Sequence, residues 1–235
     1  MPHSRVQRSA SAALVAALAL LGGSSCRHAA PAAADWNPLV GAASSFSGLY
    51  RVTCCGGRRL TAALRSDGDR LLVSVSVRPR GAVFEAWLGP GEGWAAEAPW
   101  SCRSPLVAGR LPLGDGAALP LDAGLLSLLL AGRLPDGVMD VEGAPGWVSA
   151  AVGSDWLRAR VVGPPARLDR VEAGRAGAEA EVTAVLRDHH GTVPGRLTIE
   201  AGGEKLQLEL VEWRPGSGPV PEPAWLGAAP CAEGS

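Results

Sequence analysis

Short segments of alternating apolar and polar residues follow one another along most of the chain. In the segment 46–53, Phe46, Gly48, Tyr50 and Val52 fall on one face of an extended backbone. A period of two residues is typical of a β-strand with one buried face. Gly, Pro, Asp and Ser, which favour turns, separate the segments. The pattern therefore predicts a mainly β protein built of short antiparallel strands.

The same pattern predicts where each strand lies. The expected strands cover residues 46–53, 59–65, 70–78, 82–88, 93–97, 138–142, 147–152, 156–162, 166–173, 179–187, 196–200 and 204–212. The segments 66–69 and 201–203 carry residues that favour hairpin turns. The last strand is the most regular, with Leu206, Leu208 and Leu210 expected inside.

One segment, 122–133, breaks the alternation. Its apolar residues are too closely spaced for a strand with one buried face, and they are good helix formers: Leu125, Leu126, Leu128, Leu129 and Leu130. Asp122 stands where an N-cap is expected, and Gly132 where a helix ends. The segment predicts a helix, and a shorter one is expected in residues 37–44.

About ten short antiparallel strands with one inserted helix predict a curved sheet or an open barrel, wrapped partly around that helix. Such a sheet holds either a filled core or an apolar cavity, and periodicity does not distinguish the two. The residues expected to line an apolar space between sheet and helix are Tyr50, Val73, Val75, Val77, Phe84, Leu126, Leu129, Leu208 and Leu210.

The N-terminal segment has the order of an export signal. Arg5 and Arg8 precede an apolar run, 12–21, and small residues then stand directly before Cys26. The order resembles a bacterial lipoprotein signal, in which the cysteine becomes the lipidated first residue. Gly23 replaces the Leu usual three positions before the cysteine, so an ordinary cleaved signal is the alternative. The run is shorter than the ~20 residues of a membrane-spanning helix.

The export signal and the composition that follows it divide the sequence into three expected parts. These are a signal peptide in 1–25, a lipidated cysteine with an Ala- and Pro-rich tether in 26–37, and one folded domain in 38–235. The mature chain carries 20 basic and 23 acidic residues, a net charge near −3. This charge argues against a nucleic-acid partner, which would need a basic patch. The protein is expected to be exported and held on a membrane by acyl chains rather than by a helix.

Four more cysteines remain in the exported domain: Cys54, Cys55, Cys102 and Cys231. An oxidising compartment permits two disulfides. Because a bond between adjacent residues is strained, one of Cys54 and Cys55 is expected to pair with Cys102 and the other with Cys231. A zinc site is the alternative, but the chain has no CxxC pair and no nearby His.

The sequence carries no recognised catalytic motif. GxSxG, HExxH, the P-loop and GxGxxG are all missing. Asp67 and Asp69 read as turn residues rather than calcium ligands. His189 and His190 lie in a loop between two expected strands. The protein is therefore expected to be neither an enzyme nor a metal protein, and no cofactor is implied.

Three stretches resemble the LolB family of outer-membrane lipoprotein receptors and, more loosely, its soluble periplasmic carrier. The first is 68–73 followed by 78–81, which matches a strand and a Pro-x-Gly loop. The second is the Leu-rich helix ending in 131–135. The third is 194–198 with 202–213, which is similar to the family's final hairpin.

The resemblance implies an incomplete antiparallel barrel of about eleven strands, covered by helices and enclosing an apolar cavity. It implies non-covalent transfer of lipoprotein acyl chains from a periplasmic carrier to the outer membrane. Arg27 is compatible, because it is not the Asp that retains lipoproteins in the inner membrane. The loop Pro79, Arg80, Gly81 corresponds to the membrane-insertion loop, where Arg80 replaces the usual apolar residue.

Two functions from different classes remain. The first is the acyl-chain receptor. The second is a structural or interaction lipoprotein on the same scaffold, with a filled core and no ligand. A hydrolase is the least supported alternative. Uptake of an acyl probe by the domain separates the first two.

Overall fold

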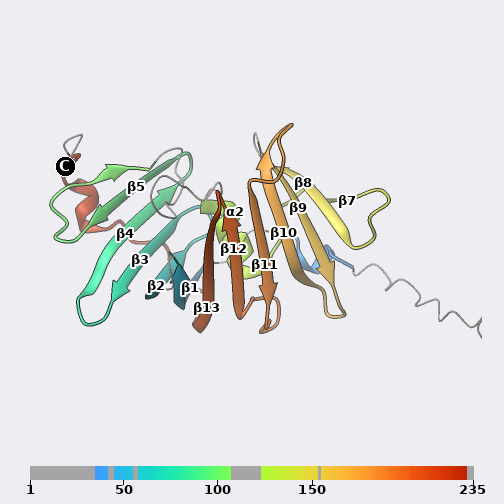
Figure 1. The fold of residues 1–235 in the computed structure, drawn as a ribbon, viewed down its shortest axis with the longest axis horizontal. Helices are drawn as coiled ribbons and strands as arrows, with labels where there is room; N and C mark the ends of the chain where they lie inside the picture. The colour runs from blue at the N-terminus through green and yellow to red at the C-terminus, as the bar shows by residue number, and fades with distance from the viewer. Residues whose placement is uncertain (1–34, 42–44, 55–57, 107–122, 153–154, 232–235) are drawn as a thin grey trace, which may run out of the picture. The chain divides into compact units, whose positions relative to one another are not determined.

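The fold is one antiparallel sheet that curves around a single helix (Figure 1). A computed structural model describes residues 35–41, 45–54, 58–106, 123–152 and 155–231 of the chain. Within these residues the sheet has 13 strands in the order β6-β5-β4-β3-β2-β1-β13-β12-β11-β10-β9-β8-β7. The edges are β6 and β7, so the barrel is incomplete, as predicted.

Thirteen strands and one α-helix are described. The first half of the sheet comprises β1 (Phe46–Cys54), β2 (Arg58–Ser66), β3 (Leu71–Val77), β4 (Gly81–Gly89), β5 (Glu92–Glu97) and β6 (Ser104–Pro105). Helix α2 (Ala123–Ala131) follows. The second half comprises β7 (Met139–Asp140), β8 (Trp147–Val152), β9 (Asp155–Val162), β10 (Arg167–Arg175), β11 (Val182–Arg187), β12 (Arg196–Ala201) and β13 (Glu204–Pro215).

Every expected strand is present, because alternation records which face of each strand is buried. The two-residue strand β6 has too little sequence to alternate and was not predicted. The expected short helix in 37–44 is the 3-10 turn η1 (Asn37–Leu39). A second 3-10 turn, η3 (Ala224–Gly227), lies in the C-terminal segment.

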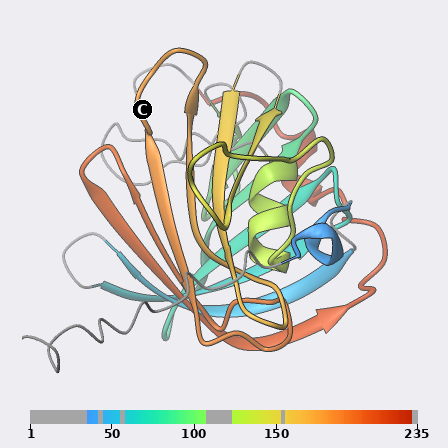
Figure 2. The ribbon, with the colours of Figure 1, turned by 90° about the vertical axis from the view of Figure 1, so that its right-hand side faces the viewer.

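The main core lies between α2 and the inner face of the sheet, the face that packs against the helix (Figure 2). Both halves of the sheet supply its side chains, for example Tyr50 from β1, Leu157 from β9 and Ile199 from β12. Leu39 from η1 and Leu134 after α2 are also fully buried there. The helix therefore fills the interior of the curved sheet.

A register shift changes the alternation of β13. Tyr50 pairs with Leu210, whereas Leu49 pairs with Glu212, so Val211 has no cross-strand partner. Val211 is 52% exposed. An extra residue of this kind is a β-bulge. The strand then continues beyond its expected end at 212 to Pro215.

Beyond the bulge, Trp213 lies on the same face of the sheet as Phe46. Their rings stack at a centroid distance of 4.2 Å, with 20° between the ring planes.

A second apolar cluster lies on the opposite, outer face of β3–β5. Trp87 and Ala96 face outward there and pack against Val220 and Trp225 of the C-terminal segment 216–231, which we call the strap. The Trp225 Nε1–H donates a 2.6 Å hydrogen bond to Glu85 Oε2. Four of the eight tryptophans belong to this cluster or pack against it, so they do not line the main core: Trp87, Trp94, Trp100 and Trp225.

The disulfide pairing expected from the sequence is wrong. Cys102 is bonded to Cys231, across 129 positions of the chain. The strap brings Cys231 to the segment after β5, where the Cys231 N–H donates to the Arg103 carbonyl at 2.9 Å. Because Cys102 and Cys231 are bonded to each other, neither pairs with Cys54, which ends β1. Cys55 lies outside the described residues.

Candidate functional site: helix α2 and the inner face

Helix α2 is apolar on all sides. Seven of its nine residues are buried, and the sequence AGLLSLLLA offers one polar side chain, Ser127. A helix of this kind is stable only where it is enclosed. Leu125, Leu126, Leu129 and Leu130 are each at most 5% exposed within the curve of the sheet. The packing of α2 therefore covers the inner face with aliphatic side chains.

The helix ends at Gly132, as the sequence predicts. The Gly132 N–H donates to the Leu129 carbonyl at 3.1 Å, and the Arg133 N–H donates to the Leu128 carbonyl at 2.8 Å. This is the Schellman arrangement, which requires a left-handed residue, and Gly132 has φ +65°. The Thr192 hydroxyl also donates to the Ala131 carbonyl at 3.2 Å. The proposed N-cap Asp122 lies outside the described residues.

The structure brings eight of the nine predicted cavity residues to one place. Five are buried members of the main core: Tyr50, Val73, Leu126, Leu129 and Leu208. Three more are partly buried and pack against it: Val75, Phe84 and Leu210. Val77 is half-buried near the end of β3 and is not among them. These side chains form a shared apolar surface, and an acyl-chain cavity among them stays a prediction.

Two buried serines join the helix to the sheet. The Ser66 hydroxyl, at the end of β2, donates a 2.8 Å hydrogen bond to the Ser127 hydroxyl of α2. The Gly68 N–H donates to Ser66 at 3.1 Å. Both serines are fully buried. Sequence reasoning missed this pair. A single serine within a run of leucines was nevertheless a signal that Ser127 makes a specific polar contact.

Tyr50 places a third hydroxyl in the same core. Its side chain is 1% exposed. Among the described residues its hydroxyl has no hydrogen-bond partner. Burial raises the pKa of Tyr50 well above the ordinary value for a phenol, so the hydroxyl keeps its proton.

The predicted membrane-insertion loop is the tip of the β3–β4 hairpin. Pro79, Arg80 and Gly81 are all exposed, as is the neighbouring Arg78. Gly81 has φ +78°, which suits a tight turn. The loop therefore presents two arginines to the surroundings. Contact of this loop with a membrane stays a prediction.

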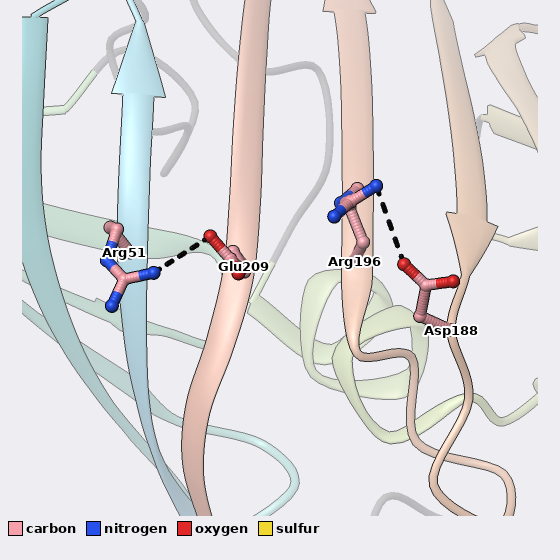
Figure 3. A network of polar contacts seen from close by, with 4 residues as sticks. All are labelled: Arg51, Asp188, Arg196 and Glu209. Atoms are coloured by element: carbon pink, nitrogen blue, oxygen red, sulfur yellow. Dashed lines mark hydrogen bonds and ion pairs between the residues drawn. The ribbon is translucent and has the colours of Figure 1, made fainter.

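The outer face of the central strands is charged and does not continue the apolar surface. Arg51 of β1 lies 3.1 Å from Glu209 of β13, and Arg196 of β12 lies 3.5 Å from Asp188 (Figure 3). Glu209 and Arg196 are cross-strand partners, so these charges form a row across the sheet. Exposed pairs of this kind contribute at most about 1 kcal/mol each.

An open hollow of about 370 Å3 lies on the same outer face, over β1–β3 and β13. Its lining includes Leu49, Leu72, Arg65 and the ion-paired Arg214 and Glu212. None of the nine predicted cavity residues lines this hollow. The hollow and the candidate site therefore lie on opposite faces of the sheet.

His189 and His190 lie after β11, as the sequence predicts for a loop. Among the described residues, no group of three or more His, Cys, Asp or Glu side chains lies close enough together to hold a metal ion. In the same residues, no helix is long and apolar enough to cross a membrane.

Comparison with solved structures identifies the fold. A Vibrio parahaemolyticus domain that is named as an outer membrane lipoprotein-sorting protein matches with a TM-score of 0.53 at 9% identity, over 77% of this chain and 89% of that one. A LolA superfamily protein from Nitrosomonas europaea has a TM-score of 0.49 at 13% identity, over 78% and 91% of the two chains. At these identities the first likeness shows a shared fold.

No protein-family model and no curated protein matches the sequence. The expected fold is thus confirmed, whereas membership of the LolB family stays a prediction.

Proposed function

We propose that the protein binds the acyl chains of lipoproteins between helix α2 and the inner face of the sheet, and helps to insert them into the outer membrane. The observation that carries the proposal is the chemistry of these two surfaces. Both are mainly apolar, and the helix is attached by apolar contacts and by the Ser66–Ser127 and Thr192–Ala131 hydrogen bonds. Such surfaces suit an apolar ligand rather than a reaction that needs charged groups.

The energetics favour this kind of ligand. Each CH2 group removed from water contributes about 0.8 kcal/mol, so a long chain gains affinity without specific polar contacts. Eight of the nine predicted cavity residues belong to the packed core or pack against it. Binding therefore requires α2 to move from the sheet, and the acyl chain replaces the leucine contacts that the helix gives up. The exchange of one apolar contact for another keeps the transfer reversible.

The arrangement of the rest of the chain suits delivery at a membrane. The signal in 1–25, Cys26 and the tether that follows it would hold the protein on the outer membrane facing the periplasm. The tether expected in 26–37 ends earlier than predicted, because Trp36 packs against the main core and η1 begins at Asn37. A periplasmic carrier would supply the cargo. The exposed tip with Pro79, Arg80 and Gly81 would face the bilayer, where an arginine contacts anionic head groups but inserts into acyl chains only at high cost.

Anchoring has a direct test. Replacing Cys26 by Ala is expected to abolish fatty-acid labelling of the protein and to release it from membranes. The parent labelled in parallel is the control. Labelling that survives Cys26→Ala would remove the anchoring site and the proposed location.

Acyl-chain binding is tested on the purified Cys26→Ala protein, which carries no acyl chain of its own to compete. A fluorescent fatty acid should bind with a saturable signal, and palmitate should displace it. Absence of saturable binding would exclude the receptor function.

Helix movement is tested by cross-linking α2 to the sheet with an engineered disulfide. The hydroxyl oxygens of Ser66 and Ser127 are 2.8 Å apart, so cysteines at both positions are within disulfide reach. The oxidised Ser66→Cys, Ser127→Cys protein should take up the fluorescent fatty acid much more slowly than the same protein after reduction. Because reduction also opens the Cys102–Cys231 disulfide, the parent measured in its oxidised and reduced forms is the matched control. Equal uptake in both forms would show that the helix does not open the site.

A structural or interaction lipoprotein is the second candidate. The observation that favours it is the burial of the predicted cavity residues in a packed core, which a protein without a ligand also requires. This candidate predicts no saturable probe binding.

A further inference from the structure

The Tyr50 hydroxyl is a polar group that the apolar core does not explain. It lies in the middle of β1, is fully buried, and has no hydrogen-bond partner among the described residues. Buried polar groups are paired in nearly all native structures, and an unpaired one destabilises the fold. Phenylalanine at this position would supply the same ring without that penalty. A ligand bound at the inner face would supply the partner that the described residues do not.

The position of the ring is specified by its neighbours. On the inner face Tyr50 lies between Ala62 of β2 and Leu210 of β13. Its ring extends along the strand over Gly48, where a Cβ atom would stand 2.7 Å from the ring Cε2. A side chain at position 48 would displace the ring. Glycine here, within a strand that otherwise carries larger residues, leaves the space that the Tyr50 ring occupies.

The hydroxyl also lies at the proposed acyl-chain site. Ala62 and Leu210 belong to the main core or pack against it, together with most of the residues expected to contact the ligand. The hydroxyl is protonated because burial raises the pKa of Tyr50. It is therefore available as a hydrogen-bond donor, and the ligand group that matches it is an acceptor.

We propose that the Tyr50 hydroxyl donates a hydrogen bond to the carbonyl oxygen of an ester- or amide-linked acyl chain, and so selects acylated ligands over plain hydrocarbons. The inference rests on the proposed acyl-chain function. An acyl chain in this linkage has one strong acceptor, the carbonyl, at the head of an otherwise apolar tail. Tyr50 thus fixes the position of the head along the inner face, while the aliphatic surfaces bind the tail.

The test compares two unlabelled competitors, methyl palmitate and hexadecane, for displacement of a fluorescent fatty acid from the full Cys26→Ala chain. In the Tyr50→Phe variant, methyl palmitate should bind about tenfold more weakly, which corresponds to about 1.4 kcal/mol. Hexadecane should bind equally to Tyr50→Phe and to the parent. Thr61→Val, which removes a half-buried hydroxyl on the outer face, is the matched control and should change neither affinity.

A second variant moves the hydroxyl without removing it. Gly48→Ala places a methyl group against the Tyr50 ring, so it should also reduce the preference for methyl palmitate over hexadecane. Thermal unfolding of each variant establishes that it is folded under the assay conditions.

Unchanged methyl palmitate binding by Tyr50→Phe would overturn the proposal, and increased stability in that case would identify the hydroxyl as an unpaired group only. If the parent binds neither competitor, the proposed function itself fails. That outcome is distinct from binding of both competitors with no dependence on Tyr50.

Discussion

The Ser66 and Ser127 hydroxyls form a buried hydrogen bond of 2.8 Å between the end of strand β2 and the middle of helix α2. They are 61 positions apart in the chain, and both are fully buried. Because the surrounding contacts are aliphatic and adapt to sliding, this directional bond fixes the helix at one position on the inner face. If α2 leaves the sheet, this hydrogen bond must break.

Removing this hydrogen bond should weaken the attachment of the helix. Ser127→Ala is expected to lower the free energy of unfolding by about 1–2 kcal/mol, because a buried partner is left incompletely paired. A double-mutant cycle with Ser66→Ala, measured by urea unfolding, should give a coupling energy of about 1 kcal/mol. The matched control is Ser76→Ala, on the outer face. Additive effects of the two substitutions would contradict the assignment.

The glycine that ends α2 should tolerate no side chain. A Cβ atom on Gly132 would stand 1.8 Å from the Thr192 carbonyl oxygen, and its φ is +65°. Gly132→Ala should therefore cost about 2–5 kcal/mol, from the left-handed backbone and the clash together. Gly137 has φ +76° and open space around it, so Gly137→Ala should cost only about 1–2 kcal/mol. The measurement is the free energy of unfolding by chemical denaturation. An equal decrease for the two variants would show that the Thr192 backbone moves away from the new side chain at no cost in free energy.

The strap should depend on its disulfide. Cys231→Ser is expected to lower the free energy of unfolding by about 2–4 kcal/mol. It should also expose Trp87 and Trp225, with a red shift of the tryptophan emission and stronger quenching by acrylamide. The reduced parent should behave as Cys231→Ser does. Unchanged emission would indicate that the apolar contacts and the Trp225–Glu85 hydrogen bond retain the strap alone.

Stability should fall on the acid side through His189. Its pKa is lowered, first by burial and also by Arg167, against opposing effects of a Leu168 backbone group, Asp169 and Asp188. The unfolded chain therefore takes up a proton near pH 6.5, whereas the folded chain does so only at lower pH. The contribution of His189 to stability is present above about pH 6.5. It is lost as the pH falls from there through the lowered pKa that His189 has in the folded protein.

The measurement is the free energy of unfolding between pH 5 and 8. His189→Gln should flatten the acid side of this profile. The same substitution at its exposed neighbour, His190→Gln, is the matched control. A His189→Gln profile parallel to that of the parent would assign the acid sensitivity to other groups.

The sequence by itself determined the strands, the helix and its end. Alternation in 46–53 marks the buried face of β1, the density of leucines marks α2, and Gly132 supplies the left-handed residue that ends it. These signals are local, because the repeat of a strand or a helix fixes which side chains share a face. The order of such segments was also enough to indicate the incomplete barrel.

The tertiary structure decided which contacts those faces make. The bulge at Val211 depends on the pairing of β13 with β1, and the outward tryptophans are explained by a strap that arrives from the far end of the chain. The same strap pairs Cys231 with Cys102 rather than with a cysteine near β1. The Ser66–Ser127 hydrogen bond and the burial of the Tyr50 hydroxyl likewise depend on neighbours distant in sequence. Periodicity records that a side chain is covered, but only the packing of remote segments determines what covers it.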